Sequence, residues 1–280
     1  MSYTSSLLFY PLIEEFGGEC VSPSYDTWFD RPLFYESGRT FKGKCLLVTA
    51  DHLDECRSNT RNCTLIFSEP IDLSGLDCPA YCPARPVSIL HLFNRLSALC
   101  DKLDSWQSGM RDVIQNHGSY DELYHLTDQV ITRGFSLFDT NFKFVSLSNK
   151  ITSQEDLLAY IVSIDPTGEQ IMPLDNIIEY TKSHEFALHS GTKEVFRIED
   201  PEPSFNINVF FEGKRVGVAS LGSGDSALED ANNCAALAAL AGYVEKLYSH
   251  YHGFFMVHSD HVKKELALRA FLDGTAQAPD

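Results

Sequence analysis

The chain has 280 residues, of which 44% are hydrophobic and 22% charged, and its 22 Lys and Arg against 39 Asp and Glu give a formal net charge of −17 at pH 7. This length predicts about two domains, and the apolar content is that of a folded protein. Phosphate contacts require clustered Lys and Arg, so we expect no direct nucleic-acid contact by this segment. The longest apolar runs are far shorter than the ~20 residues of a membrane-spanning helix.

The N-terminus has no basic flank and no small-residue cleavage site, so it does not resemble a signal peptide. We therefore expect a cytoplasmic protein with no membrane association. Eight cysteines are too few for a disulfide scaffold, and in a reducing compartment they are expected to be thiols.

Residues 1–86 have the pattern of a small α/β domain. A helix is predicted over SSLLFYPLIEEF, ending at the glycines Gly17 and Gly18. The polar segment DHLDECRS is predicted to be helical. Short strands are predicted at Pro32–Tyr35, Cys45–Thr49 and Cys63–Phe67. The proline-rich segment Ser68–Pro86 interrupts both kinds of element, and we place the domain boundary there.

Residues 87–274 begin with two predicted helices. Over Val87–His117, apolar residues recur at steps of three and four, which indicates a long amphipathic helix. A second helix is predicted over Tyr120–Thr132, where Ser119 and Glu122 have the spacing of a capping box.

The pattern then changes to alternation. FSLFDTNFKFVSLSN predicts a hairpin with its turn at Asp139–Thr140–Asn141. Helices are predicted at Gln154–Ser163 and Leu174–His189, followed by strands in KEVFRIED and in SFNINVFFEGKRVGVASLGSG, whose turn is Glu212–Gly213–Lys214.

The last predicted helix covers Asp225–Leu272, capped by Asp225 or Ser226, with a break expected near Gly253. The resulting fold class is α+β. A small N-terminal α/β unit precedes a domain with a five-stranded antiparallel sheet and long flanking helices, and residues 275–280 form a tail.

Metal and catalytic motifs are weak. The spacing of Cys56, Cys63, Cys78 and Cys82 differs from that of the common zinc knuckle, so we predict thiols and no metal site. Four histidines near the C-terminus lack an accompanying carboxylate motif and are expected on the helix surface. They are His250, His252, His258 and His261.

No catalytic signature is present either. Gly222-x-Gly224 matches neither phosphate-loop pattern, and Cys234 is surrounded by small residues that suit helix packing. We therefore predict that the chain is not an enzyme and has no cofactor.

Polar residues on the predicted sheet give the candidate ligand site. Asn206 and Asn208 alternate with apolar residues, so their amides share one face. Together with Tyr180, His184 and Arg197 they could orient a small ligand in an apolar pocket, or they could simply face solvent.

The stretch from Leu92 to Lys150 resembles the sensor region of PucR-type transcriptional regulators, the purine catabolism regulator family. The likeness lies in LFNRLSALCDKLDSW, MRDVIQNHGSYDELYHL and above all GFSLFDTNFKFVSLS. This resemblance implies a GAF-like or PAS-like domain over residues 87–274, with Asp139 in the family's aspartate position and Phe144 in the same site. ALRAFLDG resembles the segment that in the family leads toward a C-terminal helix-turn-helix.

The expected function is the sensing of a small-molecule effector by part of a bacterial transcription regulator whose DNA-binding domain lies outside this chain. The alternatives are a soluble enzyme with a Cys or His site, and a pocketless dimerisation scaffold. We also expect a homodimer formed through the two long helices, although the same apolar residues could instead pack on the N-terminal domain. These residues are Leu96, Leu99, Leu103, Val244, Leu247 and Tyr251.

Overall fold

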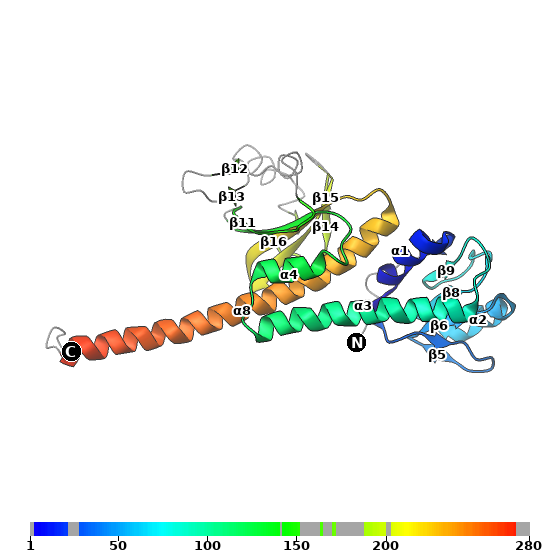
Figure 1. Ribbon diagram of the computed structural model, residues 1–280, viewed down its shortest axis with the longest axis horizontal. Coiled ribbons are helices and arrows are strands. Elements are labelled where there is room, and N and C mark those ends of the chain that lie inside the picture. The colour runs from blue at the N-terminus through cyan, green and yellow to red at the C-terminus, as the bar shows by residue number, and fades with distance from the viewer. Residues whose placement is uncertain are drawn as a thin grey trace.

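The structure, a computed structural model, has an α+β fold with two five-stranded sheets (Figure 1). It describes residues 3–21, 28–140, 142–151, 163–164, 170–171, 188–199 and 203–272, and of residues 28–29, 59–61, 163–164, 170–171 and 252–272 only the backbone. No helix within these ranges is both long enough and apolar enough to span a membrane. The predicted helices at Gln154–Ser163 and Leu174–His189 lie almost entirely outside the described residues, although Ser163 belongs to a short strand.

The N-terminal unit combines a largely parallel sheet with short helices. Its helices are α1 (Ser5–Phe16), the 3-10 helix η1 (Ala50–His52) and α2 (Leu53–Asn59). The sheet, in spatial order, contains β2 (Glu19–Val21), β9 (Ala80–Cys82), β8 (Thr64–Phe67), β6 (Cys45–Val48) and β4 (Leu33–Phe34). Two small pairs are β1 (Tyr3–Thr4) with β3 (Trp28–Phe29), and β5 (Phe41–Lys42) with β7 (Thr60–Arg61). The predicted α/β character of this region is confirmed.

The proline-rich segment 68–86 is not a simple connector, and this part of the prediction was wrong. It contains β9, which pairs in parallel with β8 and antiparallel with β2 inside the sheet. Pro79 and Pro83 flank the strand, where a missing N–H removes no ladder hydrogen bond. The Pro79 carbonyl even accepts a bond of 2.8 Å from the Leu65 N–H.

The two helices after the N-terminal unit follow the sequence pattern closely. Helix α3 covers Ile89–Gln115 and α4 covers Tyr120–Thr127, five residues shorter than predicted. The Ser119 hydroxyl accepts from the Glu122 N–H, and the Glu122 carboxylate accepts in turn from the Ser119 N–H, so the predicted capping box is present.

The C-terminal sheet is antiparallel with five strands, as predicted. In spatial order it contains β11 (Phe144–Leu147), β10 (Phe135–Asp139), β16 (Lys214–Gly222), β15 (Ser204–Phe211) and β14 (Phe196–Ile198). Glu212 and Gly213 both have positive φ in the two-residue turn between β15 and β16, which matches the twist of a tight hairpin. A further small pair consists of β12 (Ser163–Ile164) and β13 (Gln170–Ile171).

The last helix, α8, covers Ala227–Leu272 and continues past the end of α3 toward the C-terminus (Figure 1). The Ser226 hydroxyl accepts from the Glu229 N–H at 3.2 Å, which confirms Ser226 as the cap. The break predicted near Gly253 is absent. One glycine costs a helix only about 1 kcal/mol relative to alanine, and its neighbours in the sequence include no proline.

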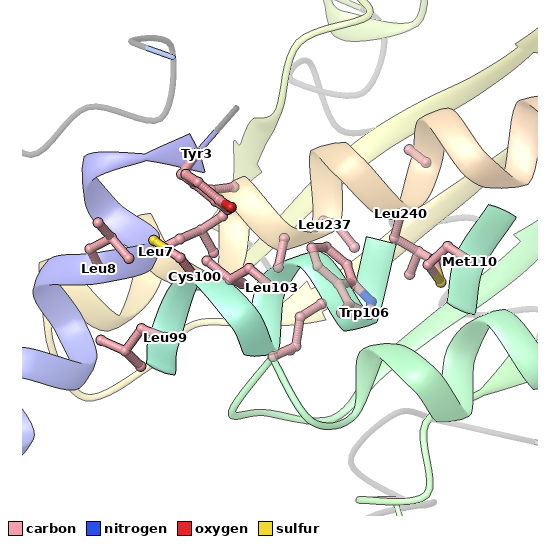
Figure 2. Close-up of a cluster of buried hydrophobic side chains, with 14 of the residues drawn as sticks. Tyr3, Leu7, Leu8, Leu99, Cys100, Leu103, Trp106, Met110, Leu237 and Leu240 are labelled. Carbon is pink, nitrogen blue, oxygen red and sulfur yellow. The ribbon is translucent and has the colours of Figure 1, made fainter. Parts of the chain in front are cut away.

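One hydrophobic core joins the N-terminal unit to the C-terminal sheet. Helices α1, α3 and α8 pack together, and their buried side chains form one cluster with residues of both sheets. Figure 2 shows part of this cluster, in which side chains from α1 meet Leu99 and Cys100, while Trp106 and Met110 lie beside α8.

This packing buries the apolar residues on which the dimer prediction rested. Five of the six are at least nine-tenths buried within a single chain and Tyr251 is half-buried. Other parts of the same chain therefore cover these apolar side chains, so they give no support to a dimer.

Trp106 lies at the centre of this core, fully buried, and its indole N–H donates to the Thr127 hydroxyl at 3.2 Å. Trp106→Ala is expected to lower the free energy of unfolding by about 3–5 kcal/mol because a large cavity is left. Leu90→Ala, on the same helix but 61% exposed, should change it by less than about 0.5 kcal/mol. Urea denaturation followed by circular dichroism measures both, and equal losses would contradict the placement of α3.

A buried polar network holds the start of α8 against the segment before β10. The Glu229 carboxylate accepts from the Thr132 hydroxyl at 2.6 Å, from the Asp225 N–H at 2.8 Å and from Arg133 Nε at 3.1 Å. Burial raises the pKa of Glu229, but these hydrogen bonds and the Arg133 charge outweigh it, so the net pKa is lowered.

A carboxyl group with a lowered pKa in the folded state stabilises the fold above its unfolded pKa, near 4.3, and this contribution is lost as the pH falls through the folded value. Glu229→Gln is therefore expected to cost about 2 kcal/mol at pH 7, and the difference from the wild type should shrink below about pH 4. Denaturation midpoints at several pH values test this. Glu194→Gln, an exposed control, should show no such trend.

Candidate functional site

The two faces of the C-terminal sheet differ in character. The first face packs on the helices through apolar residues of the central strands, listed as Phe135, Leu137, Ile207, Val209, Ala219 and Leu221. The opposite face carries a separate apolar cluster of Phe138, Phe196, Ile198 and Val218, with Phe142 and Phe144 against it. We call this second face, together with its asparagines and serines, the polar-aromatic face.

Strand register arranges the polar-aromatic face in two rows. One row crosses the sheet through Phe196, Asn206, Ser220, Ser136 and Leu147. The next row contains Asn208, Val218, Phe138 and Phe144. Aromatic side chains, amides and hydroxyls therefore share one surface, a combination found in sites that bind small polar molecules with flat apolar bodies.

Asn208 is the most constrained polar group on this face. Its side chain is 2% exposed, and its Nδ2 donates to the His189 carbonyl at 2.8 Å and to the Thr192 carbonyl at 2.9 Å. Two carbonyl partners fix the orientation of the amide, because only the NH₂ group can donate to both. The amide oxygen is buried, and no donor among the described residues lies within hydrogen-bond distance of it.

Neighbouring groups complete the surroundings of Asn208. Asn206 is fully buried and donates to the Ser204 hydroxyl at 3.1 Å. The His189 ring stacks on Phe196 at 5.0 Å, so the segment 188–192 lies over the sheet beside the two asparagines. This segment and the strands hold the Asn208 amide between them.

The structure brings together three of the seven predicted site residues, Phe144, Asn206 and Asn208. Arg197 pairs with Phe205 on the helix-facing side, where its guanidinium lies 5.6 Å over that ring and forms an ion pair of 3.1 Å with Glu199. Asp139 is paired with Gly217 at the end of β10 and also faces the helices.

The remaining two predictions, Tyr180 and His184, lie outside the described residues. Sequence reasoning missed Phe138, Phe196 and His189. The alternation of β10 could have indicated Phe138, but Phe196 depends on the register between β14 and β15, and His189 on how the segment 188–192 packs over the sheet.

Asp139 instead borders a small apolar cavity of about 80 Å³ between the sheet and the helices, beside Tyr120, Leu137, Val244 and Tyr248. It also accepts a hydrogen bond of 3.0 Å from the Lys143 N–H, which closes the β10–β11 turn. Within the described residues, this carboxylate therefore helps to hold the turn.

The cysteines that were considered as a nucleophile or as zinc ligands are buried in the core. Cys234 is 5% exposed on α8, and burial raises its pKa to about 12, so its thiol is a poor nucleophile at neutral pH. The four cysteines considered for zinc, Cys56, Cys63, Cys78 and Cys82, are buried thiols in the N-terminal unit. Within the described ranges, no group of three or more His, Cys, Asp or Glu could hold a metal ion.

His250, the one C-terminal histidine whose side chain is described, contacts His117 through a hydrogen bond of 2.6 Å between ring nitrogens. This contact ties the end of α3 to α8. Gly222 ends β16, and Gly224 lies in the loop before Ser226, where its N–H donates to the Asp230 carboxylate at 2.6 Å.

Comparison with known proteins gives a distant likeness in structure. No family model matches the chain, and no curated protein matches it. One similar solved structure is the GAF domain from Acinetobacter phosphoenolpyruvate-protein phosphotransferase, with a TM-score of 0.30, 11% identity, and coverage of 52% of this chain and 94% of that chain. Another is the cofactor-binding GAF domain of the nutrient sensor CodY from Clostridium difficile, with a TM-score of 0.28, 15% identity, and coverage of 50% and 96%.

Proposed function

We propose that this chain is the effector-sensing part of a cytoplasmic bacterial transcription regulator of the PucR type, and that the effector binds on the polar-aromatic face. The observation that carries this proposal is the buried Asn208 oxygen, which is fixed in orientation and has no donor among the described residues. A buried acceptor without a donor costs about 1–3 kcal/mol, and a ligand that supplies an N–H or O–H removes this cost.

The surroundings of Asn208 support one chemical class of effector. The rings of Phe138, Phe144 and Phe196 lie on the same face, with Phe138 and Phe196 buried and Phe144 half-buried. The effector is therefore a small molecule with a flat apolar body and at least one hydrogen-bond donor directed at the Asn208 oxygen. Of the predicted site residues, Tyr180 and His184 remain candidates for further contacts.

The acidic composition supports the assignment of effector binding and DNA binding to different domains of the regulator. A segment with a net charge of −17 is repelled by a phosphate backbone, so DNA contact is assigned to a domain outside this chain. Homodimerisation remains part of the proposal, through surfaces other than the buried faces of α3 and α8.

A thermal-shift screen of small metabolites with flat rings and N–H donors tests the proposal. A ligand at 100 times its Kd should add about 2.7 kcal/mol of stability. Asn208→Ala and Phe144→Ala are each expected to weaken the binding of a hit at least tenfold, while Asn94→Ala, an exposed asparagine on α3, should leave it unchanged.

Two results would contradict the sensor proposal. Hits whose affinity is the same in Asn208→Ala and the wild type would place binding elsewhere, and an absence of hits with an intact fold would favour a pocketless scaffold. Turnover on a panel of hydrolase and transferase substrates that is lost in Cys234→Ala would favour an enzyme.

Asn208→Asp tests the fixed amide separately from any ligand. A carboxylate there would face the His189 and Thr192 carbonyls instead of donating to them. Burial and this repulsion favour the protonated acid, so the loss of stability, about 2–4 kcal/mol at pH 7.5, should decrease as the pH falls toward 5. Denaturation midpoints at both pH values measure the effect, and Asn94→Asp is the exposed control.

A further inference from the structure

A cavity of about 490 Å³ lies in the N-terminal unit, away from the polar-aromatic face. It is lined by Lys42, Cys56, Arg57, Ser58, Asn62, Gly75, Leu76, Asp77 and Cys78. A cavity of this size accommodates a small organic molecule. None of its residues belongs to the C-terminal sheet.

The fold builds this cavity where three parallel strands begin. Lys42 lies shortly before β6, Asn62 shortly before β8, and Gly75 to Cys78 lead into β9, while the last turn of α2 supplies the remaining wall. Gly43, Asn62 and Gly75 each have positive φ, so every one of the three lead-in segments turns sharply. Asn62 suits this position because asparagine is one of the few residue types besides glycine that adopt the left-handed conformation.

Two cations with unused hydrogen-bond donors face this cavity. The Lys42 ammonium has no acceptor among the described residues. Arg57 donates to Asp54 at 3.1 Å and to the Ser74 carbonyl at 3.1 Å, which occupies two of its five N–H groups. The Asp54 side chain is 95% exposed, so this ion pair is weak and leaves the guanidinium attractive to a second anion.

Three apolar residues form one part of the lining, which we call the floor of the cavity. Leu76, Cys56 and Cys78 are buried at 9%, 0% and 7% exposure. Burial raises the pKa of Cys56 to about 12, so this thiol is neutral at pH 7 and acts as a small hydrophobic surface. A cationic rim above an apolar floor suits a ligand with a charged head and a short apolar body.

We propose that this cavity binds a small organic anion, a carboxylate or a phosphate ester, whose oxygens accept from Lys42, Arg57 and Asn62 and whose apolar body covers the Cys56, Leu76 and Cys78 floor. Arg57 and Asn62 offer directed N–H donors, and Lys42 a point charge, to such an oxyanion. The single lining carboxylate, Asp77, is exposed and leaves the lining with one net positive charge in a chain of net charge −17. This site is independent of the effector site proposed above.

Calorimetric titration of the full chain with phenyl phosphate, benzoate and inorganic phosphate tests the proposal. Phenyl phosphate or benzoate should bind, more weakly as salt is raised, and more tightly than inorganic phosphate, which lacks the apolar body. Lys42→Gln with Arg57→Gln should lower the affinity at least tenfold. Lys44→Gln, which removes a nearby lysine paired with Asp30 outside the cavity, should not.

Thiol labelling locates the site. Bound phenyl phosphate should slow the reaction of Cys78 with methyl methanethiosulfonate, followed by mass spectrometry, and leave Cys20 on β2 unaffected. The proposal is overturned if neither organic anion binds at 10 mM, if the double variant binds as the wild type does, if Cys78 is not protected, or if inorganic phosphate binds as tightly as phenyl phosphate. Circular dichroism of each variant confirms that the exposed substitutions leave the fold intact.

Discussion

The packing of α3 determines the arrangement of the molecule. This helix is 27 residues long, which corresponds to about 40 Å, more than one small domain needs to cover its own core. Its buried stripe runs from Leu92 to Met110, against α1 and the N-terminal sheet at one end and against α4 and α8 at the other. Midway along α3, Arg31 bridges Asp101 and Asp104, and Tyr3 donates to Asp104 at 2.7 Å. Because one core spans both units, neither can move against the other without exposing apolar surface.

Features that depend on local pattern could be predicted from the sequence. The stripe of α3, the capping box of Ser119 and the pairing of neighbouring strands in both hairpins each depend on residues close together in the chain, and all are present. Alternation along β15 likewise predicted that Asn206 and Asn208 share a face. The proline content of residues 68–86 led to the wrong prediction that this segment contains no strand. Strand β9 is only three residues long and has prolines just outside both ends.

Features that depend on distant register could not be predicted. The sequence analysis placed Arg197 and Asn206 in the same site, yet Arg197 pairs with Phe205 and faces the other side of the sheet. A shift of one residue in register decides which face a side chain occupies. The cavity of Lys42 and Arg57 is similar, since it forms only when the segments before three strands and the last turn of α2, all between residues 42 and 78, come together in the fold. The only sequence signal was that these cations occur in a strongly acidic chain.

Strand β15 gives the proposed effector site a direct physical connection to α8. Its Asn208 faces the polar-aromatic side, while its neighbours Ile207 and Val209 pack into the core that contains Leu237, Leu240 and Val244 of α8. The Phe210 N–H also donates to the Glu245 carboxylate of α8 at 2.9 Å. Close-packed cores transmit small displacements because they have little free volume. A ligand that donates a hydrogen bond to the Asn208 oxygen therefore acts on β15. The other face of this strand and its backbone both contact α8, the helix that leads to the C-terminus.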